Sequence, residues 1–359
     1  MKSLYSGLDR RLEQKAPLAL ATIIEAEGST PQIAGASALF SKEGLLCGTL
    51  GGGVIEADAQ EKAVRCLIER KSLYYEFELQ GNISASEGAI CGGSVSILID
   101  ASPLDHLEAF KRLKKSLLSR QPGILISKVR ITPSGDASIS RHWLGEKPPH
   151  EDAAEKDLSS VAEEIEEVRL EWKPKLIRKK EREETGVLFF FEPLSPLFRL
   201  VIAGAGHIGQ AVAHLGSLLD FEVTVIDDRV EFANPERFPQ TDAMIVADIG
   251  RALADFPVSS DTYVVIVTRG HSYDAEALRA CIQSSAAYIG MIGSRRKVSL
   301  MREKFVSEGW ATAAQFDRVH APIGLEIGSK TVEEIAVSIA AELVRVRSHV
   351  GEKKAGGHK

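Results

Sequence analysis

Apolar and polar positions follow a short-period pattern in the first half of the chain, where brief apolar runs are separated by turns rich in glycine. Residues 18–26 (LALATIIEA) are typical of a buried strand, and residues 36–50 (ASALFSKEGLLCGTL) predict a hairpin. From Val54 to about Arg70, apolar side chains recur at helical spacing, which predicts a helix. These elements favour a mixed α+β domain over residues 1–196.

One part of this half differs in composition. Residues 145–184 are rich in charge and poor in aromatic side chains, and the stretches EKPPHEDAAEKD and IRKKEREE are typical of a solvated surface. We therefore predict an exposed helix with loops there. The next apolar run, residues 185–194 (TGVLFFFEPL), predicts a buried strand that rejoins the first sheet, and Pro193 and Pro196 mark the linker to the next domain. No internal repeat is evident in the sequence.

Beyond Arg199 the pattern changes to a regular alternation of short apolar strands and helical segments. Strands are expected at LVIAG, EVTVID, AMIVAD, TYVVIVT and YIGMIG. Alternation of this kind predicts a Rossmann-like, doubly wound parallel sheet over residues 197–348. The expected fold class is therefore α/β, with the mixed α+β domain first. TVEE at residues 331–334 predicts a capping box, and residues 349–359 are expected to be a disordered tail.

Composition narrows the class of protein. The 359 residues suggest about two domains, and 44% hydrophobic with 26% charged residues is ordinary for a globular protein. A net charge of −6 argues against a nucleic-acid or membrane-surface binder. The four cysteines form no CxxC pair, which favours reduced thiols and a cytoplasmic location. No apolar run is long enough to span a membrane. We expect a homo-oligomer.

The clearest motif is the dinucleotide fingerprint G-x-G-x-x-G, formed by residues 204–209 (GAGHIG). It follows a strand, opens a helix and precedes a second strand that ends in an acid, Asp227, about 20 residues on. The pattern predicts that NAD or another ADP-containing nucleotide binds here. It also predicts that Asp227 accepts a hydrogen bond from a ribose hydroxyl. Arg229 weakens that assignment, and a retained fold with a repurposed site is the alternative. The predicted nucleotide contacts are Gly204, Gly206, His207, Gly209, Asp227, Thr268 and His271.

Two later strand ends should border the same crevice. TRGHSYDAEAL follows the fourth strand, and His271 is a candidate ligand contact in that loop. GSRRK at residues 293–297 places three cations at a helix start, where the helix dipole disfavours them. A phosphate nearby would relieve that conflict, and solvated surface charge is the alternative.

Three turns of small residues end strands of the first domain: GSTP from Gly28, GGG from Gly51 and CGG from Cys91. Their exposed amides are suited to an anion, although Glu56 and Asp58 in the following helical turn are an alternative partner for its dipole. Taken singly, each turn is explained by architecture alone. Together they predict a pocket into which a large ligand fits closely. The candidate residues are Gly28, Ser29, Thr30, Cys47, Gly51, Gly52, Gly53, Cys91, Gly92 and Gly93.

These motifs in combination resemble the xanthine dehydrogenase accessory factor family (XdhC/CoxI type). The resemblance is carried by GSTPQIAGA, GTLGGGVIEAD and CGGSV in the first domain. In the second it is carried by LVIAGAGHIG, VTVIDDR, TRGHSYDAEAL, YIGMIGSRRK and APIGLEIGSKTVEEIAVSIAAEL. It implies a chaperone of purine catabolism that binds molybdopterin-type molybdenum cofactor, protects it during sulfuration by a cysteine desulfurase, and inserts it into an apo-enzyme of the xanthine dehydrogenase type.

On this resemblance Cys91 is the first candidate for a contact to molybdenum, because a soft thiolate suits a soft metal-sulfur centre, and Cys47 is the second. Some family members carry a cysteine directly after the triple glycine, where this chain has Val54. Many carry His-Asp-His where this chain has residues 269–271 (RGH). The alternative function is an NAD-dependent oxidoreductase, in which His271 with Asp274 would supply acid-base chemistry. Of the two, we favour a non-catalytic accessory protein of xanthine dehydrogenase over a dehydrogenase, and whether the chain is itself an enzyme stays open.

Overall fold

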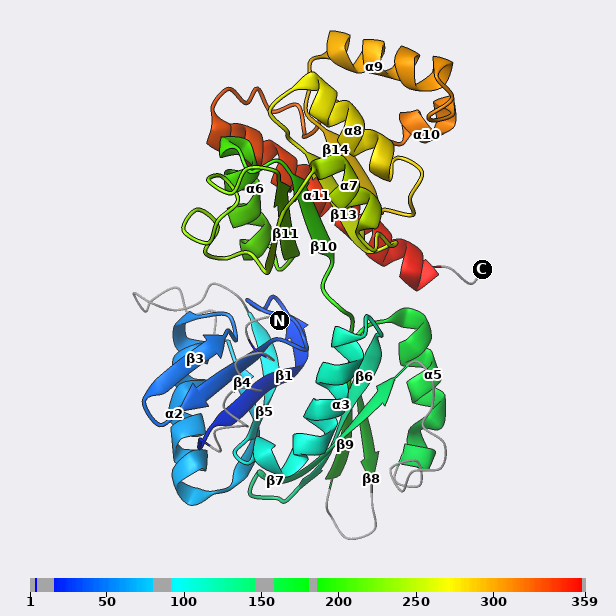
Figure 1. Cartoon of the computed structure of the whole chain (residues 1–359). Coiled ribbons are helices and arrows are strands. Elements are labelled where there is room, and N and C mark those ends of the chain that lie inside the picture. The colour runs from blue at the N-terminus through cyan, green and yellow to red at the C-terminus, as the bar shows by residue number, and fades with distance from the viewer. Residues whose placement is uncertain (1–3, 5–15, 80–91, 146–157, 181–185, 357–359) are drawn as a thin grey trace. The chain divides into compact units, whose positions relative to one another are not determined.

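The computed structural model describes residues 4, 16–79, 92–145, 158–180 and 186–356. The chain forms two compact units, Met1–Pro196 (unit 1) and Leu197–Lys359 (unit 2). Their colours run from blue to green and from green to red in Figure 1.

Unit 1 is built on an antiparallel sheet of nine strands in the order β3-β2-β1-β5-β4-β7-β6-β9-β8. The strands are β1 (Ala19–Gly28), β2 (Ser37–Ser41), β3 (Gly44–Gly48), β4 (Ser72–Glu78), β5 (Gly93–Asp100), β6 (Gly123–Ile131), β7 (Asp136–Gly145), β8 (Lys175–Lys180) and β9 (Gly186–Leu194). The predicted first strand, the hairpin and the strand at 185–194 are confirmed. The edge strand β8 also approaches β1, an inner strand of the sheet order, and Arg178 on β8 donates to Glu25 on β1 with a nitrogen–oxygen distance of 2.7 Å.

The helices of unit 1 cover both faces of this sheet. They are α2 (Gly53–Glu69), η1 (Pro103–His106), α3 (Leu107–Leu118), η2 (Ser159–Val161) and α5 (Ala162–Glu171). The predicted helix from Val54 to Arg70 is confirmed as α2. Its buried face packs against side chains of β1 and β5 such as Ala21 and Ile97. Helix α3 packs against the alternate residues, such as Leu20 on β1, and therefore lies on the opposite face.

The topology of unit 1 repeats, although no repeat is evident in the sequence. The segment β1-β2-(β3)-α2-β4-β5 has the strand order β2-β1-β5-β4, and the segment β6-β7-α5-β8-β9 has the order β7-β6-β9-β8. The pairing Gly28↔Gly93 between β1 and β5 has its counterpart in Ile131↔Gly186 between β6 and β9. Loops and helices of different length hide the repeat in the sequence, and only the strand pairing reveals it.

The charged stretch 145–184 contributes more to the core than its composition indicates. Leu158, Val161, Ile165 and Val168 are buried against β6 and β9. Its end forms strand β8 at the edge of the sheet, where loops were expected. Lysine and arginine suit an edge strand because they discourage further pairing. Residues 146–157 and 181–185 lie outside the described residues.

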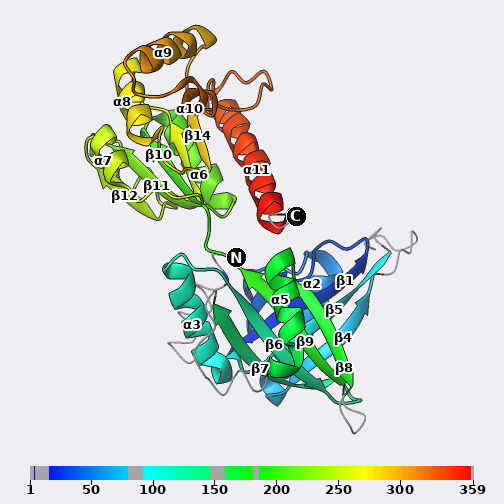
Figure 2. The same cartoon turned by 90° about the vertical axis from the view of Figure 1, so that its right-hand side faces the viewer.

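Unit 2 is a parallel sheet of five strands in the order β12-β11-β10-β13-β14. The strands are β10 (Arg199–Ala203), β11 (Glu222–Asp227), β12 (Ala243–Val246), β13 (Thr262–Ile266) and β14 (Tyr288–Met291). The helices are α6 (His207–Leu218), α7 (Ile249–Asp255), α8 (His271–Cys281), α9 (Arg295–Ser307), α10 (Ala313–Asp317) and α11 (Val332–Gly356). Helices α6 and α11 cover one face, and α7 and α8 cover the other (Figure 2). The predicted Rossmann-like sheet is confirmed.

The last helix begins as predicted and ends later than predicted. Thr331 Oγ1 accepts from the Glu334 amide at 3.2 Å, and Glu334 Oε2 accepts from the Thr331 amide at 3.0 Å, which is a capping box. Helix α11 extends to Gly356 and so includes most of the stretch expected to be a disordered tail. Glu352, Lys353 and Lys354 are good helix formers, which accounts for the extension. No helix in the described part of the chain is long and apolar enough to cross a membrane.

Candidate functional site

The three glycine turns of unit 1 meet at one edge of the sheet, which we call the three-turn edge (Gly28–Pro31, Gly51–Gly53 and Gly92–Gly93). Gly28 pairs with Gly93 in the sheet. A Cβ built on Gly93 would lie 2.5 Å from the Glu27 carbonyl oxygen, and one built on Gly51 would lie 2.7 Å from Pro31 Cγ. Backbones this close leave no space for side chains. The structure therefore brings together turns that are more than 20 residues apart in the sequence.

The amides at this edge are open. Gly52 and Gly53 have positive φ angles of 70° and 57°, and a Cβ at either position would meet nothing within 4 Å among the described residues. Neither amide has an acceptor within the described part of the chain. Both stand at the N-terminus of α2, where the helix dipole favours negative charge. An anionic group of a ligand fits this position.

Glu56, the alternative partner of the dipole, is committed elsewhere. Its Oε2 accepts from the Leu50 amide at 3.0 Å and from the Thr49 hydroxyl at 2.7 Å. Asp58 forms an ion pair with Lys62. These contacts fix the turn before the glycines and leave the amides of residues 52–53 available.

Of the two candidate thiols, the structure describes Cys47 alone. Cys91 lies outside the described residues. Cys47, on β3, packs in the apolar cluster with Leu20 and Phe110, on the α3 face of the sheet. The triple glycine leads into α2, which covers the other face. The structure does not bring Cys47 to the three-turn edge.

In unit 2 the fingerprint turn packs closely against its strand and helix at two of its three glycines. Gly204 has a φ of 117°, and a Cβ there would lie 2.4 Å from the Val267 carbonyl oxygen. A Cβ on Gly209 would lie 1.9 Å from the Gly204 carbonyl oxygen, so helix and strand pack closely. A Cβ on Gly206 would meet no described atom within 4 Å. The second glycine therefore leaves open the space that a pyrophosphate occupies in this fold.

Asp227 is 2% exposed, and its carboxylate is fully engaged. Oδ1 accepts from the Arg229 amide and from Arg229 Nε at 3.1 and 2.8 Å, and Oδ2 accepts from the Ala205 amide and from Arg229 Nη2 at 2.8 and 2.9 Å. A carboxylate has about four acceptor positions. Burial raises the pKa of Asp227, but the hydrogen bonds from Arg229 and the Ala205 amide outweigh it and lower the pKa to about 2. A ribose hydroxyl needs Arg229 to move.

This arrangement predicts the effect of removing Arg229. We expect NAD to bind more tightly than NADP, and we expect the ratio of the two affinities to rise about tenfold in Arg229→Ala. In that variant two acceptor positions of Asp227 become free for ribose, and its charge then repels a 2′-phosphate without compensation. Calorimetric titration measures both affinities. A variant that prefers NADP would contradict the role given to Asp227.

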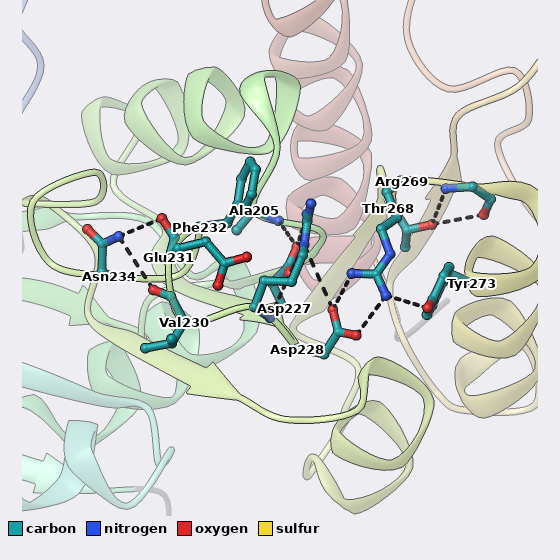
Figure 3. A network of polar contacts seen from close by, with 12 residues as sticks. Ala205, Asp227, Asp228, Val230, Glu231, Phe232, Asn234, Thr268, Arg269 and Tyr273 are labelled. Carbon is teal, nitrogen blue, oxygen red and sulfur yellow. Dashed lines mark hydrogen bonds and ion pairs between the residues drawn. The ribbon is translucent and has the colours of Figure 1, made fainter.

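The loops that follow the carboxyl ends of the strands in unit 2 form what we call the carboxyl edge. A second ion pair joins two of these loops. Arg269, after β13, donates from both terminal nitrogens to Asp228, after β11, at 2.8 and 2.8 Å. Its guanidinium also lies over the Tyr273 ring at 4.1 Å from the centroid and donates to the Tyr273 hydroxyl. Figure 3 shows Asp228, Arg269 and Tyr273 in a row beside Asp227. Sequence reasoning missed this network, whose only signal is an Asp-Asp-Arg run at one strand end and an arginine at another.

Asp274 does not orient His271. It is 1% exposed; its Oδ1 accepts from the Thr268 hydroxyl at 2.6 Å and from the Thr268 amide at 3.2 Å, and its Oδ2 pairs with Lys297. His271 is exposed at the first position of α8. The acid-base pair of the oxidoreductase alternative is therefore not formed. The conflict expected for the cations of residues 293–297 is relieved for Lys297 by this buried carboxylate.

His207 stands apart from the other predicted nucleotide contacts. It is exposed and lines a cleft of about 570 Å³ between α6, residues 236–241 and the start of α11. Glu236 and Glu333 contribute to the walls, and none of the other predicted nucleotide contacts lies there. The amides of Gly206 and His207 have no acceptor within the described residues, so the N-terminus of α6 is open.

Metal ligation by protein side chains alone is not supported at either edge. Within the described ranges, no three His, Cys, Asp or Glu side chains lie close enough together to hold a metal ion. Open backbone amides are the recurrent feature of both sites.

Comparison with family models gives two matches. Residues 11–77 match the model described as "XdhC and CoxI family", and residues 200–343 match the model described as "XdhC Rossmann domain". Together these matches cover more than half of the chain. They take in the first two turns of the three-turn edge and all of the carboxyl edge.

Relatives align over nearly the whole chain. An uncharacterized protein of Escherichia coli, YqeB, is 27% identical over 97% of this chain, which spans 47% of the length of that relative. A Bacillus subtilis protein named as a probable xanthine dehydrogenase subunit is 26% identical, over 98% of this chain and 99% of its own. The molybdenum cofactor insertion chaperone PaoD of Escherichia coli is 22% identical over 93% of this chain and 84% of its own.

A solved structure has the same fold. The crystal structure of a protein described as a xanthine dehydrogenase from Bacillus halodurans superposes with a TM-score of 0.74 at 25% identity. The match covers 96% of each chain.

Proposed function

We propose a function for this chain from one premise, which is that the chain belongs to the XdhC and CoxI family. On our proposal it is an accessory protein that binds molybdenum cofactor as cargo and inserts it into an apo-enzyme of the xanthine dehydrogenase type. The insertion chaperone PaoD is a relative that aligns over 93% of this chain. That relationship supports the class of cargo.

One observation carries the proposal. Three separate turns converge at the three-turn edge, and their six glycines present backbone with open amides at residues 52–53. The molybdenum cofactor is a pterin with a phosphate group, so it offers an anion for the amides of residues 52–53 and a flat ring for close backbone contact. Held this way, the cargo is bound mainly through backbone contacts. That suits transfer to another protein.

Sulfuration of the cargo is the finer part of the proposal. A cysteine desulfurase would act while the cofactor is held at the three-turn edge. In unit 2 we propose an ADP-containing nucleotide such as NAD, bound over the open amides of Gly206 and His207. No hydride transfer is assigned to it, because Asp274 is committed to Thr268 and Lys297.

The experiment that tests the function is a reconstitution. Purified protein, molybdenum cofactor and apo-xanthine dehydrogenase are mixed in all combinations, and enzyme activity is followed. We expect activity only when all three are present, with one cofactor delivered per protein. Mass spectrometry of the protein purified from a cofactor-producing host should show the bound cargo. Steady NADH turnover by this protein alone, lost in His271→Ala, would instead support the oxidoreductase.

The thiols separate in a second test. We expect Cys91→Ala to retain its melting temperature, since removing one sulfur leaves a small cavity. We expect it to lose most of its molybdenum, because Cys91 is the first candidate for the contact to the metal. Cys47→Ala is the control: we expect it to keep its molybdenum, because Cys47 packs on the α3 face. Molybdenum content and melting temperature are measured for both. If Cys91→Ala keeps its full molybdenum content, the Cys91 thiol takes no part in cargo binding.

A further inference from the structure

The ion pair between Arg269 and Asp228 crosses the nucleotide crevice of unit 2. In the sheet order, β10 lies between β11 and β13. Asp228 follows β11 and Arg269 follows β13, so their contact passes over the carboxyl end of β10, where the fingerprint turn begins. The packing of the turn agrees with this. A Cβ on Gly204 would lie 3.0 Å from Thr268 Cα, so the residue before Arg269 rests directly on the turn.

This position coincides with the path of a pyrophosphate. In this fold a dinucleotide extends across the crevice, with its phosphates at the N-terminus of the first helix. The space beside Gly206 is open, and the helix amides are the donors already aimed there. A helix N-terminus carries only about half a positive charge. Two phosphate charges at this point therefore favour a nearby cation.

Three cations at the carboxyl edge differ in how firmly they are held. Arg229 is paired with Asp227, whose side chain is 2% exposed, and Lys297 with Asp274, whose side chain is 1% exposed. Removing either cation would leave a buried carboxylate uncompensated, which is costly. Arg269 is paired with Asp228, whose side chain is 32% exposed. Water can solvate Asp228 when its partner leaves, so Arg269 is the most easily released of these three cations.

We propose that Arg269 is a phosphate-binding residue of the nucleotide site, held on Asp228 until the pyrophosphate of the ligand takes the place of that carboxylate. This inference rests on the nucleotide role proposed for unit 2. Arg269 has the chemistry for the exchange, because a guanidinium binds carboxylate and phosphate through the same pair of parallel hydrogen bonds. Tyr273 holds the guanidinium by its ring and hydroxyl and so keeps it at the crevice during the exchange.

The exchange predicts opposite effects for the two partners of one ion pair. Arg269→Ala removes a charge-assisted contact to phosphate, and the affinity for NAD should fall at least about tenfold. Asp228→Asn releases Arg269 from its resting partner, and the affinity should rise about two- to fivefold. Arg269→Lys keeps the charge and loses the paired hydrogen bonds, so its affinity should lie between wild type and Arg269→Ala.

The test is calorimetric titration of the full chain with NAD, with melting temperatures to verify folding. Arg302→Ala and Asp317→Asn are matched controls, because Arg302 and Asp317 form a similar exposed ion pair in the same unit, with nitrogen–oxygen distances of 2.9 and 3.3 Å. Both controls should bind NAD as wild type does.

Each other outcome overturns the inference in a distinct way. Loss of affinity in both Arg269→Ala and Asp228→Asn would mean that the ion pair only shapes the loops. A gain in both would mean that the pair blocks the crevice without binding phosphate. Unchanged affinity for NAD in both variants would mean that the ion pair does not contact the ligand. Wild-type protein that binds neither NAD nor ADP would refute the nucleotide role itself, and the inference with it.

Discussion

Gly206→Val is expected to fold normally and to bind NAD at least about a hundredfold more weakly than wild type. Gly206 has an ordinary φ of −68°, and a Cβ there meets nothing within 4 Å in the part of the chain that the structure describes. A side chain at this position is therefore expected to cause neither backbone strain nor a clash with the described residues. On the proposed nucleotide role, the new side chain occupies the space that the pyrophosphate would take. Calorimetry and a melting curve measure the two expectations.

The comparison variant is Gly209→Val, three residues along. Its Cβ would lie 1.9 Å from the Gly204 carbonyl oxygen, so the helix must move away from the strand. We expect unfolding or a loss of about 3 kcal/mol or more of stability. If Gly206→Val binds NAD with wild-type affinity, the open space at the second glycine is not a nucleotide site.

The second large effect concerns the three-turn edge: Gly92→Val is expected to lose about nine-tenths or more of its molybdenum cofactor and to keep its melting temperature. Gly92 is exposed, its φ is not positive, and a Cβ there would meet nothing within 4 Å among the described residues. Within the described residues, a side chain at this position therefore interferes with a ligand at the edge and with no part of the fold. Molybdenum content after purification from a cofactor-producing host is the measurement.

The repeat in unit 1 supplies the matched control. Gly186 begins β9 beside Ile131 as Gly93 begins β5 beside Gly28. Gly186 is also exposed, and a Cβ there would meet nothing within 4 Å in the described ranges. Gly186→Val tests the same substitution at the equivalent strand of the half that has no triple glycine. It should load normally. Equal loss of cofactor in Gly186→Val, or full loading in Gly92→Val, would separate cofactor binding from the three-turn edge.

Local patterns were sufficient for most of the fold. The alternation of strands and helices beyond Arg199 predicts a parallel sheet, because each strand and helix carries its own periodicity. The stretch 145–184 shows where this reasoning ends. In β8 (KLIRKK), Leu176 and Ile177 stand among four cationic residues. The edge strand forms because β9 offers it a partner, which no local pattern in 175–180 reveals.

The candidate sites divide in the same way. The fingerprint at residues 204–209 can be found from sequence, because spacing within one strand–turn–helix unit determines its geometry. The hydrogen bonds from Arg229 to Asp227 could not be found from sequence, since an arginine two residues away has many alternative conformations. Asp228 and Arg269 are 41 residues apart, and only the sheet order brings them together.

By itself, the sequence determined which segments form strands and helices, where the fingerprint turn lies and which turns consist of bare backbone. These properties depend on neighbours a few residues away, where glycine, spacing and hydrophobic period act directly. Tertiary structure alone decided that three glycine turns share one edge, that the strands of unit 1 form a repeat, and which carboxylates hold Arg229, Arg269 and Lys297. Those outcomes depend on strand pairing and burial between segments far apart in the chain, which no local pattern records.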